Sequence, residues 1–358
     1  MQHRLAGLAS YPQFDRCQLR QAAHGNVTRA VFSLAAPASL SRQGGSSTAL
    51  FLRRHSDPRR RFRQLLAGPD PVLCPGCYDA LSARLVEEAG FDAAYMTGFG
   101  TSASRLGRAD VGLLTMPEMV DNARRIVDAL AIPLLADADT GYGNPINVIR
   151  TVQEYERAGV AAIHIEDQAA PKKCGHMEGK QLVSAAEMVE KIRAAVEARV
   201  DPNFLLIART DARAVEGLQA AIDRGRRYHE AGADILFIEA PQSEAEIAEV
   251  ATAFSGVPLL FNYAEGGKTP AVSYEQLREL GFKIVIFPIG TLLAATRAMR
   301  ALLARIREDG TPINVLSELL AFSEFTSFIG LPEIQELERR FGTAEPTTSR
   351  SVDGGGER

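Results

Sequence analysis

The strongest constraint on the fold is a pattern of eight short apolar runs, each followed by a turn and an amphipathic stretch of helical period. The runs cover residues 72–74, 93–97, 133–139, 161–167, 204–210, 235–240, 258–263 and 283–288. Helical stretches follow, for example at 78–89, 117–130, 184–199 and 220–231. Strands this apolar must be covered on both faces, which favours a parallel sheet, and eight strand-then-helix units predict a (β/α)8 TIM barrel. An open doubly wound sheet is the alternative.

The 358 residues divide into four predicted segments. Residues 1–56 carry one acid, Asp15, against seven arginines, a composition typical of a disordered leader, a transit-like segment or an extension beyond the true start. Residues 57–312 are predicted to form the barrel. Residues 313–342 carry further helical pattern, which we interpret as oligomer contacts, and residues 343–358 are predicted to be a disordered tail.

Composition excludes several classes of protein. The net charge of -4 argues against a protein that depends on neutralising phosphates, so we expect no nucleic-acid partner. No run approaches the roughly 20 apolar residues of a membrane span. Four scattered cysteines are too few for a disulfide framework and favour a reducing compartment. We therefore expect a cytoplasmic protein, and organellar targeting by the leader stays open.

Polar residues and one glycine stand at the ends of most of the apolar runs, where a barrel has its active site. They are Tyr95, Thr97, Gly98, Asp137, Asp139, Glu166, Asp167, Arg209, Asp211, Glu239 and Asn262. Asp137 and Asp139 are two residues apart, so on one strand they would share a face. Hard oxygen ligands suit Mg²⁺, and Glu166 would hold one of the waters bound to the ion. The alternative is a turn and helix cap before Gly141. Arg209 and Asn262 would supply donors to an anionic substrate.

Residues 169–180 form a loop in which Cys174 follows Lys172 and Lys173 and precedes His176. Neighbouring cations favour the thiolate and would make the thiol a competent proton donor or acceptor. Gly175 and Gly179 would act as hinges of a closing lid. The alternative is a solvated basic loop with an incidental cysteine.

Two further patterns favour structural interpretations. Residues 98–103 fit the dinucleotide pattern G-x-G-x-x-A, but Gly107 and Gly112 interrupt the next stretch and Pro117 opens the helix we expect. Cys74 and Cys77 have redox spacing, but no second pair exists for zinc, and a turn at the end of the strand is the better interpretation.

The strings TGFGTSAS, LLADADTGYG, HIEDQ, PKKCGH, IARTDA and FNYAEGGKTP together resemble the isocitrate lyase and phosphoenolpyruvate mutase superfamily. The resemblance runs from about residue 59 to 312 and is greatest to short lyases of the methylisocitrate and 2,3-dimethylmalate type. It implies a barrel that binds Mg²⁺, with Mn²⁺ as a possible substitute, and a homotetramer built as a dimer of dimers.

The same resemblance implies roles for individual residues. Asp137 would bind the metal directly, with Asp110, Asp139 and Glu166 contacting it through water. Tyr95, Thr97, Gly98, Phe99, Arg209, Glu239 and Asn262 would surround the 2-oxo-acid part of a small carboxylate substrate. Cys174, beside Lys172 and His176, would be the proton donor of the lyases, which the mutases lack.

The implied reaction is a retro-Claisen cleavage. Tyr95 would take the proton of a 2-hydroxyl group, and Cys174 would protonate the departing fragment, with pyruvate as a plausible 2-oxo product. Phe99 and the loop sequence from Met177 to Lys180 depart from the pattern of methylisocitrate lyases and favour a smaller or more apolar substrate, such as an alkylated malate. Oxaloacetate hydrolysis and mutase chemistry are alternatives on the same scaffold, as are dinucleotide-dependent oxidation and ligand binding without catalysis.

Overall fold

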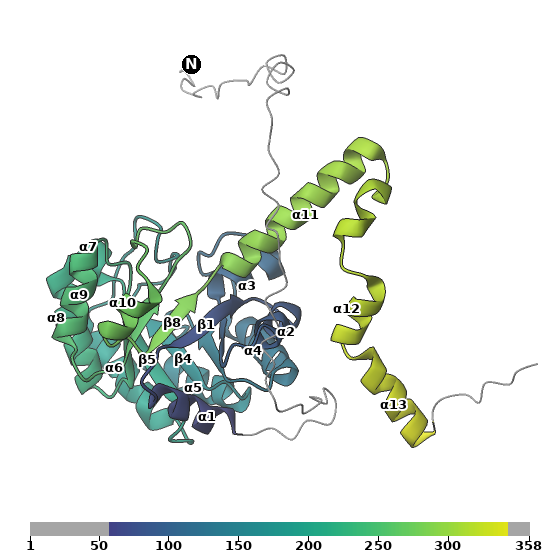
Figure 1. The fold of residues 1–358 in the computed structure, drawn as a ribbon. Coiled ribbons are helices and arrows are strands. Elements are labelled where there is room, and N and C mark those ends of the chain that lie inside the picture. Colours follow the sequence, from purple (N-terminus) through teal and green to yellow (C-terminus); the bar gives the residue numbers. More distant parts are fainter. Residues whose placement is uncertain (1–56, 343–358) are drawn as a thin grey trace, which may run out of the picture. The chain divides into compact units, whose positions relative to one another are not determined.

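The computed structural model describes residues 57–342, and these contain a closed barrel of eight parallel strands (Figure 1). The strands are β1 (Val72–Cys77), β2 (Ala94–Met96), β3 (Leu134–Asp137), β4 (Ala162–Glu166), β5 (Leu205–Thr210), β6 (Ile235–Ile238), β7 (Leu259–Asn262) and β8 (Ile284–Phe287). β1 pairs with β8 in the register Val72 to Ile284, which closes the barrel. The prediction of a TIM barrel is therefore confirmed, and the open sheet is excluded.

Helices alternate with the strands, as the apolar periodicity predicts. They are α1 (Pro58–Leu66), α2 (Ala80–Glu88), α3 (Gly98–Leu106), α4 (Met116–Ala129), α5 (Pro145–Arg157), α6 (Ala185–Ala198), α7 (Ala212–Val215), α8 (Leu218–Glu230), α9 (Glu244–Ala253) and α10 (Tyr274–Glu279). Many begin at a side-chain cap, such as Asn144 before α5 and Ser184 before α6. No helix of the described part is long and apolar enough to cross a membrane.

Alternate residues of the strands face two different cores. One core joins strand residues to helix residues such as Met119 and Ile192, so it lies between the sheet and the helices. The other contains strand residues of the opposite parity, such as Ile207 and Phe237, and fills the barrel interior. The polar residues at the strand ends occupy the same alternate positions as the residues of the interior core. Their side chains therefore point into the barrel mouth.

Helix α1 closes the opposite end of the barrel. Its Phe62 is fully buried and belongs to the interior core. Arg59 pairs with Asp201 at 3.0 Å, and Arg61 pairs with Asp92 at 3.0 Å. Helix α1 is the first element of the described residues, and the predicted segments 1–56 and 343–358 lie outside them.

The predicted turn at Cys74 and Cys77 is wrong, because both residues lie within β1. Cys74 belongs to the interior core and Cys77 to the outer core, since residues three apart on a strand face opposite sides. Both are free thiols, and burial raises the pKa of each far above the ordinary value. The pair is therefore structural.

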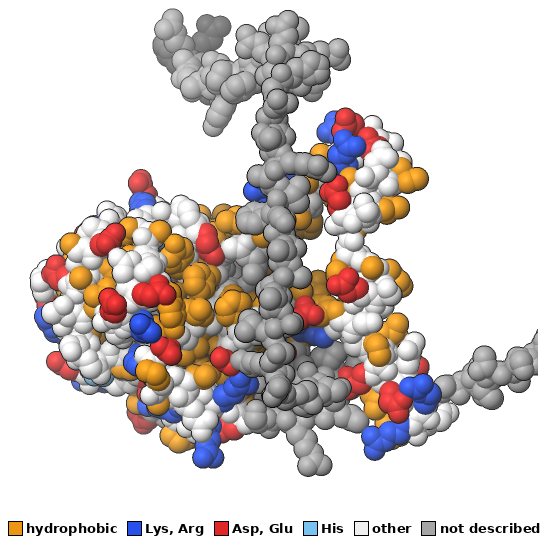
Figure 2. Space-filling model, in the orientation of Figure 1, with side chains coloured by type: hydrophobic (Ala, Val, Ile, Leu, Met, Phe, Trp, Pro, Cys, Tyr) orange, Lys and Arg blue, Asp and Glu red, His pale blue; other side chains and the backbone are white. Residues whose placement is uncertain are grey.

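The chain continues beyond the barrel in α11 (Gly290–Asp309), a 3₁₀ helix (Ile313–Glu318), α12 (Phe322–Phe328) and α13 (Leu331–Phe341). We call residues 290–342 the C-terminal segment. None of the residues in α11, α12 or α13 is buried. Exposed apolar side chains recur along this segment (Figure 2). They are Leu293, Met299, Leu303, Ile313, Leu316, Leu319, Leu320, Phe322, Phe325, Ile329, Leu331 and Phe341.

Candidate active site

The candidate site lies at the carboxyl ends of the strands, where inward-facing polar residues surround a cavity of about 240 Å³. Eleven of the residues singled out from the sequence line it: Tyr95, Thr97, Phe99, Asp110, Asp137, Lys172, Cys174, His176, Arg209, Glu239 and Asn262. Asp139 lines a neighbouring cavity of about 440 Å³, and Lys172 lines both. The eight-fold pattern therefore brings together residues that are up to 167 positions apart.

A cluster of buried acids occupies one side of the mouth. The Lys172 amine lies 2.7 Å from Asp110 Oδ1 and 2.6 Å from Asp139 Oδ1. Burial, together with the charges of Asp137 and Asp110, raises the pKa of Asp139 to about 6, although Lys172 opposes the shift. Burial also raises the pKa of Glu166 well above its ordinary value. Ionisation of these two buried acids is therefore disfavoured unless a further cation binds beside them.

The sequence prediction that Asp137 and Asp139 share a strand face is wrong in its geometry. β3 ends at Asp137, and Asp139 lies beyond it with a φ of 48°. The turn directs Asp139 toward Lys172, and its backbone N–H donates to Asp137 Oδ1 at 2.9 Å. Both acids reach the mouth, but a left-handed turn places the second one there.

This set of residues fits a divalent cation. Six buried acids (Asp110, Asp137, Asp139, Glu166, Asp211 and Glu239) face three buried cations (Lys172, Lys180 and Arg209) around the mouth. Glu166 Oε1 is a buried acceptor with no hydrogen-bond donor. Within residues 57–342, no three carboxylates, imidazoles or thiolates are close enough to chelate a metal by themselves. Mg²⁺ commonly takes only one or two protein carboxylates and keeps several waters, so the set suits it.

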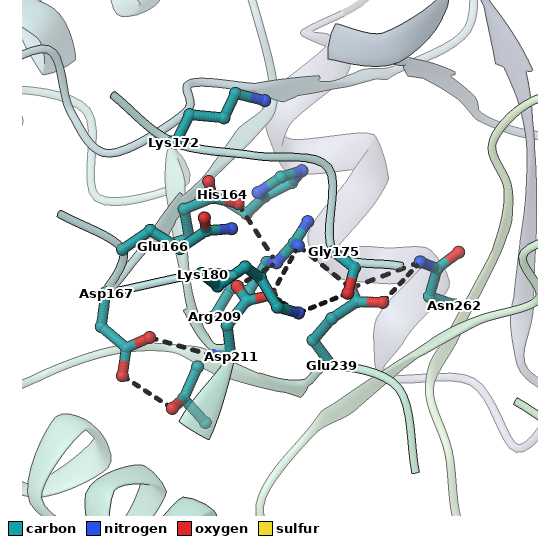
Figure 3. Close-up of polar contacts among 12 residues, drawn as sticks. His164, Glu166, Asp167, Lys172, Gly175, Lys180, Arg209, Asp211, Glu239 and Asn262 are labelled. Atoms are coloured by element: carbon teal, nitrogen blue, oxygen red, sulfur yellow. Dashed lines mark hydrogen bonds and ion pairs between the residues drawn. The ribbon is translucent and has the colours of Figure 1, made fainter. Parts of the chain in front are cut away.

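Arg209 stands at the centre of the opposite side (Figure 3). Its Nε lies 3.0 Å from Asp211 Oδ2 and 3.2 Å from Glu166 Oε2, and its Nη2 lies 3.4 Å from Glu239 Oε2. Asn262 Nδ2 donates to Glu239 at 3.3 Å. Three carboxylates thus fix the guanidinium in one orientation at the cavity wall, where its planar donors suit a substrate carboxylate.

Tyr95 is paired with a histidine that sequence reasoning missed. The Tyr95 hydroxyl lies 2.9 Å from His164 Nε2, and both side chains are buried. Burial lowers the pKa of His164 to about 4, and burial raises the pKa of Tyr95 well above its ordinary value, so both groups are neutral near pH 7. His164 is two residues before Glu166 on β4, and this inward parity is the signal that could have revealed it.

The loop from residue 167 to 184 carries Cys174 over the cavity. Cys174 N donates to Asp110 O at 3.2 Å, and His176 Nε2 lies 3.0 Å from Glu239 Oε1. The expectation that lysines favour a thiolate is wrong, because Lys172 binds the acids and burial raises the pKa of the Cys174 thiol above its ordinary value. The thiol is protonated at neutral pH, as a proton donor must be.

The two glycines of this loop serve different purposes. Gly179 has a φ of 74°, which suits a turn. Gly175 is buried against the barrel, and a Cβ there would lie only 2.7 Å from Glu239 Cδ. Gly175 therefore allows close approach of the loop to the site, whereas the sequence suggested a hinge.

The glycine-rich stretch after β2 does form a helix, contrary to the sequence expectation. Helix α3 begins at Gly98, and Gly98 N donates to Asp137 Oδ2 at 3.2 Å. A Cβ at Gly98 would collide with the Asp137 carboxylate. This helix N-terminus therefore faces a protein carboxylate, not a dinucleotide phosphate.

The fold and this site together define an enzyme of the TIM-barrel class with an acid cluster, a fixed arginine and a thiol on a loop. A family model described as phosphoenolpyruvate phosphomutase matches residues 62–307. The chain belongs to the phosphoenolpyruvate mutase and isocitrate lyase superfamily, a family of carbon–carbon lyases and mutases.

Individual relatives agree with this assignment. A 2,3-dimethylmalate lyase of Eubacterium barkeri is 49% identical over 79% of this chain and 98% of its own length. A 2-methylisocitrate lyase of Aeropyrum pernix is 46% identical over 77% of this chain and 88% of its own length. The structure of a phosphonopyruvate hydrolase with oxalate and Mg²⁺ is 33% identical, with a TM-score of 0.74, and covers 80% of this chain and 99% of that one.

Proposed function

We propose that this enzyme is a Mg²⁺-dependent carbon–carbon lyase that cleaves a 2-hydroxy di- or tricarboxylate to a 2-oxo acid, such as pyruvate, and a second carboxylate. One observation carries the proposal: a half-buried, protonated thiol, Cys174, lines the same cavity as the acid cluster and Arg209. A lyase needs an acid at this place, because the fragment that leaves with the electron pair of the broken bond is strongly basic. The lyases among the relatives support the same reaction class.

The acid cluster would hold the metal. We propose Asp137 as the direct ligand, with Asp110, Asp139 and Glu166 contacting the ion through water. When bound, Mg²⁺ supplies positive charge that binds the substrate carboxylate and lowers the pKa of its 2-hydroxyl group. The magnesium in the hydrolase relative supports this choice.

The protein's own side chains would then move two protons. The pair of Tyr95 and His164, whose hydroxyl and Nε2 lie 2.9 Å apart, would accept the proton of the 2-hydroxyl group, and Asp137, 3.7 Å from His164 Nε2, would favour the protonated pair. The C2–C3 bond breaks, its electron pair stays with C3, and C2 becomes the carbonyl carbon of the 2-oxo acid. Cys174 donates its proton to C3, and Arg209 balances the charge of the substrate carboxylate. The closed loop limits the access of water.

The lining of the cavity favours an alkylated malate over a tricarboxylate. Phe99, Met177, Ala264, Pro288 and Ile289 contribute apolar surface. Both fixed cations of the lining are already paired: Arg209 with three acids and Lys172 with two. A third substrate carboxylate would have no unpaired cation among the described lining residues, whereas methyl groups would gain apolar contact.

The test is incubation of the purified protein with Mg²⁺ and a panel of 2-hydroxy acids, with detection of the released 2-oxo acid. We expect 2,3-dimethylmalate to be cleaved with a higher kcat/KM than 2-methylisocitrate. Cys174→Ser should lower kcat at least about a hundredfold, because a hydroxyl is a far weaker acid than a thiol. Because burial raises the pKa of Cys174, the alkaline fall in wild-type kcat should come at a higher pH than ionisation of an exposed thiol would give.

Other outcomes would select another chemistry. Acetate and oxalate formed from oxaloacetate, with no cleavage of any alkylated malate, would identify a hydrolase. Phosphorus–carbon bond rearrangement that persists in Cys174→Ser would identify a mutase. Binding of the acids without any product would contradict catalysis.

We also propose that the enzyme is a homotetramer, a dimer of dimers, in which the C-terminal segment covers a second copy of the chain. The segment has no buried residue in its three α-helices and exposes apolar side chains along its length, which supports a partner surface.

A further inference from the structure

The loop that carries Cys174 is fastened at its base by the backbone. Ala169 N donates to Gln181 O at 2.7 Å, and Val183 N donates to Asp167 O at 2.9 Å. These bonds pair the two ends of the loop with each other just beyond β4. Residues 170–180 between them form the tip of the loop. Whether the tip covers the cavity therefore depends on contacts made by the tip itself.

Lys180 is the last residue of the tip and is buried, with a side chain only 2% exposed. Its amine lies 2.7 Å from Asp211 Oδ1 and donates to the backbone carbonyl of Gly175 (Figure 3). One ammonium group thus joins the barrel to the carbonyl of the residue that follows Cys174. No step of the proposed mechanism uses this lysine.

Asp211 is a fixed support for this contact. It follows β5 and is fully buried, and its backbone N–H donates to Asp167 Oδ1 at 2.9 Å. Burial opposes ionisation of Asp211, but Arg209 and Lys180 hold its pKa below the ordinary value. The same carboxylate accepts two hydrogen bonds from Arg209, at 3.0 and 3.1 Å. Lys180 therefore shares its anchor with the residue proposed to bind the substrate carboxylate.

Gly175 is buried, and the side of it where a Cβ would stand lies against Glu239 and Arg209. A buried carbonyl without a donor is unfavourable, because it loses its water and gains no partner. Lys180 supplies the donor from a position held by Asp211. This amine therefore adds to the contacts that hold the tip at the barrel, which also include Cys174 N to Asp110 O and His176 to Glu239.

We propose that Lys180 is a positioning residue that latches the Cys174 loop shut by bridging the Gly175 carbonyl and Asp211. The proposal rests on the proposed function for its effect on turnover, but the latch itself is a property of the free enzyme. It differs from Lys172, whose amine binds Asp110 and Asp139 on the other side of the site.

The test compares Lys180→Met and Lys180→Arg with wild type in the full chain. The first readout is the rate at which iodoacetamide alkylates Cys174, followed by mass spectrometry of its peptide at pH 8 and pH 9. Loss of the latch should raise this rate about tenfold in Lys180→Met at both pH values, because an open tip gives the reagent access to the thiol. Lys180→Arg should restore part of the protection.

The matched control is Lys268→Met. Lys268 lies in another loop, is exposed, and pairs with exposed Glu178 of the same tip at 3.7 Å. An exposed pair of this kind contributes little, so this variant should match wild type. If Lys180→Met does not fold, Lys180→Gln, which is also uncharged, takes its place with the same expected direction.

The second readout is turnover. Lys180→Met should lower kcat about tenfold or more with a much smaller change in KM, because it misplaces a proton donor and leaves Arg209 in position. A folded Lys180 variant with wild-type alkylation of Cys174 would overturn the latch. A protein without lyase activity would contradict the proposed function only, because alkylation is measured without substrate.

Discussion

At the scale of single residues, the acid cluster is the feature that most affects behaviour in solution. Asp110 and Asp139 share one lysine, and burial with the neighbouring carboxylates raises the pKa of Asp139 to about 6. A raised pKa means that protons and a metal ion compete for the same carboxylate in a pH range that is easily reached.

We therefore expect Mg²⁺ affinity to fall as the pH falls through 6. With a pKa of about 6, Asp139 is about nine-tenths protonated at pH 5, so the Kd for Mg²⁺ should rise about tenfold between pH 7.5 and pH 5. Isothermal titration calorimetry measures this change. Asp139→Asn should bind Mg²⁺ more weakly at pH 7.5 and should lose most of the pH dependence. A wild-type Kd that is constant over this range would contradict the role of Asp139.

At the scale of elements, the two ends of the barrel have different roles: one contributes stability and the other carries the site. The amino ends of the strands are closed by α1, whose arginines pair with acids of neighbouring loops. The carboxyl ends carry the polar residues and the Cys174 loop. Changes at the two ends of the barrel should therefore have different consequences.

Phe62→Ala tests this separation. Phe62 is fully buried in the interior core, so its truncation should lower the free energy of unfolding by about 3–5 kcal/mol. Urea denaturation measures the loss. Because α1 lies at the end opposite the site, kcat per folded molecule should stay at the wild-type value. Arg60→Ala, an exposed change in the same helix, is the control and should alter neither quantity.

At the scale of the whole molecule, the C-terminal segment is the part that the barrel does not explain. Phe322 is 83% exposed, and Leu303 and Phe341 are each more than 60% exposed. So many exposed apolar side chains in one segment are typical of a surface that another chain covers. Within the described residues, this segment is the main candidate for subunit contact.

Sedimentation of the full chain tests the proposed assembly. We expect the mass of a tetramer, and we expect Phe322→Ser combined with Phe341→Ser to shift the chain toward smaller species by removing apolar contact area. Val200→Ser, at an exposed apolar residue outside the segment, should leave the mass unchanged. A wild-type chain that sediments as a monomer at micromolar concentration would contradict the proposal.

Much of the fold was predictable because its signals are local. Eight apolar runs with helices between them specify the barrel through burial on both faces of a parallel sheet. Strand parity then predicts that residues such as Glu239 and Asn262 point into the mouth, as they do. The same parity, applied to His164, would have revealed the partner of Tyr95.

The sequence by itself determined the eight-fold repeat, the residues at the strand ends and the presence of a thiol on a loop, because periodicity and residue type act over a few positions. Only the tertiary structure decided that Lys172 turns to the acids, that Asp139 reaches the mouth through a left-handed turn, and that Lys180 contacts Gly175 and Asp211. These outcomes depend on burial and on charges brought together from distant parts of the chain. Such effects raise the pKa of Cys174, where neighbouring lysines in the sequence suggested the opposite.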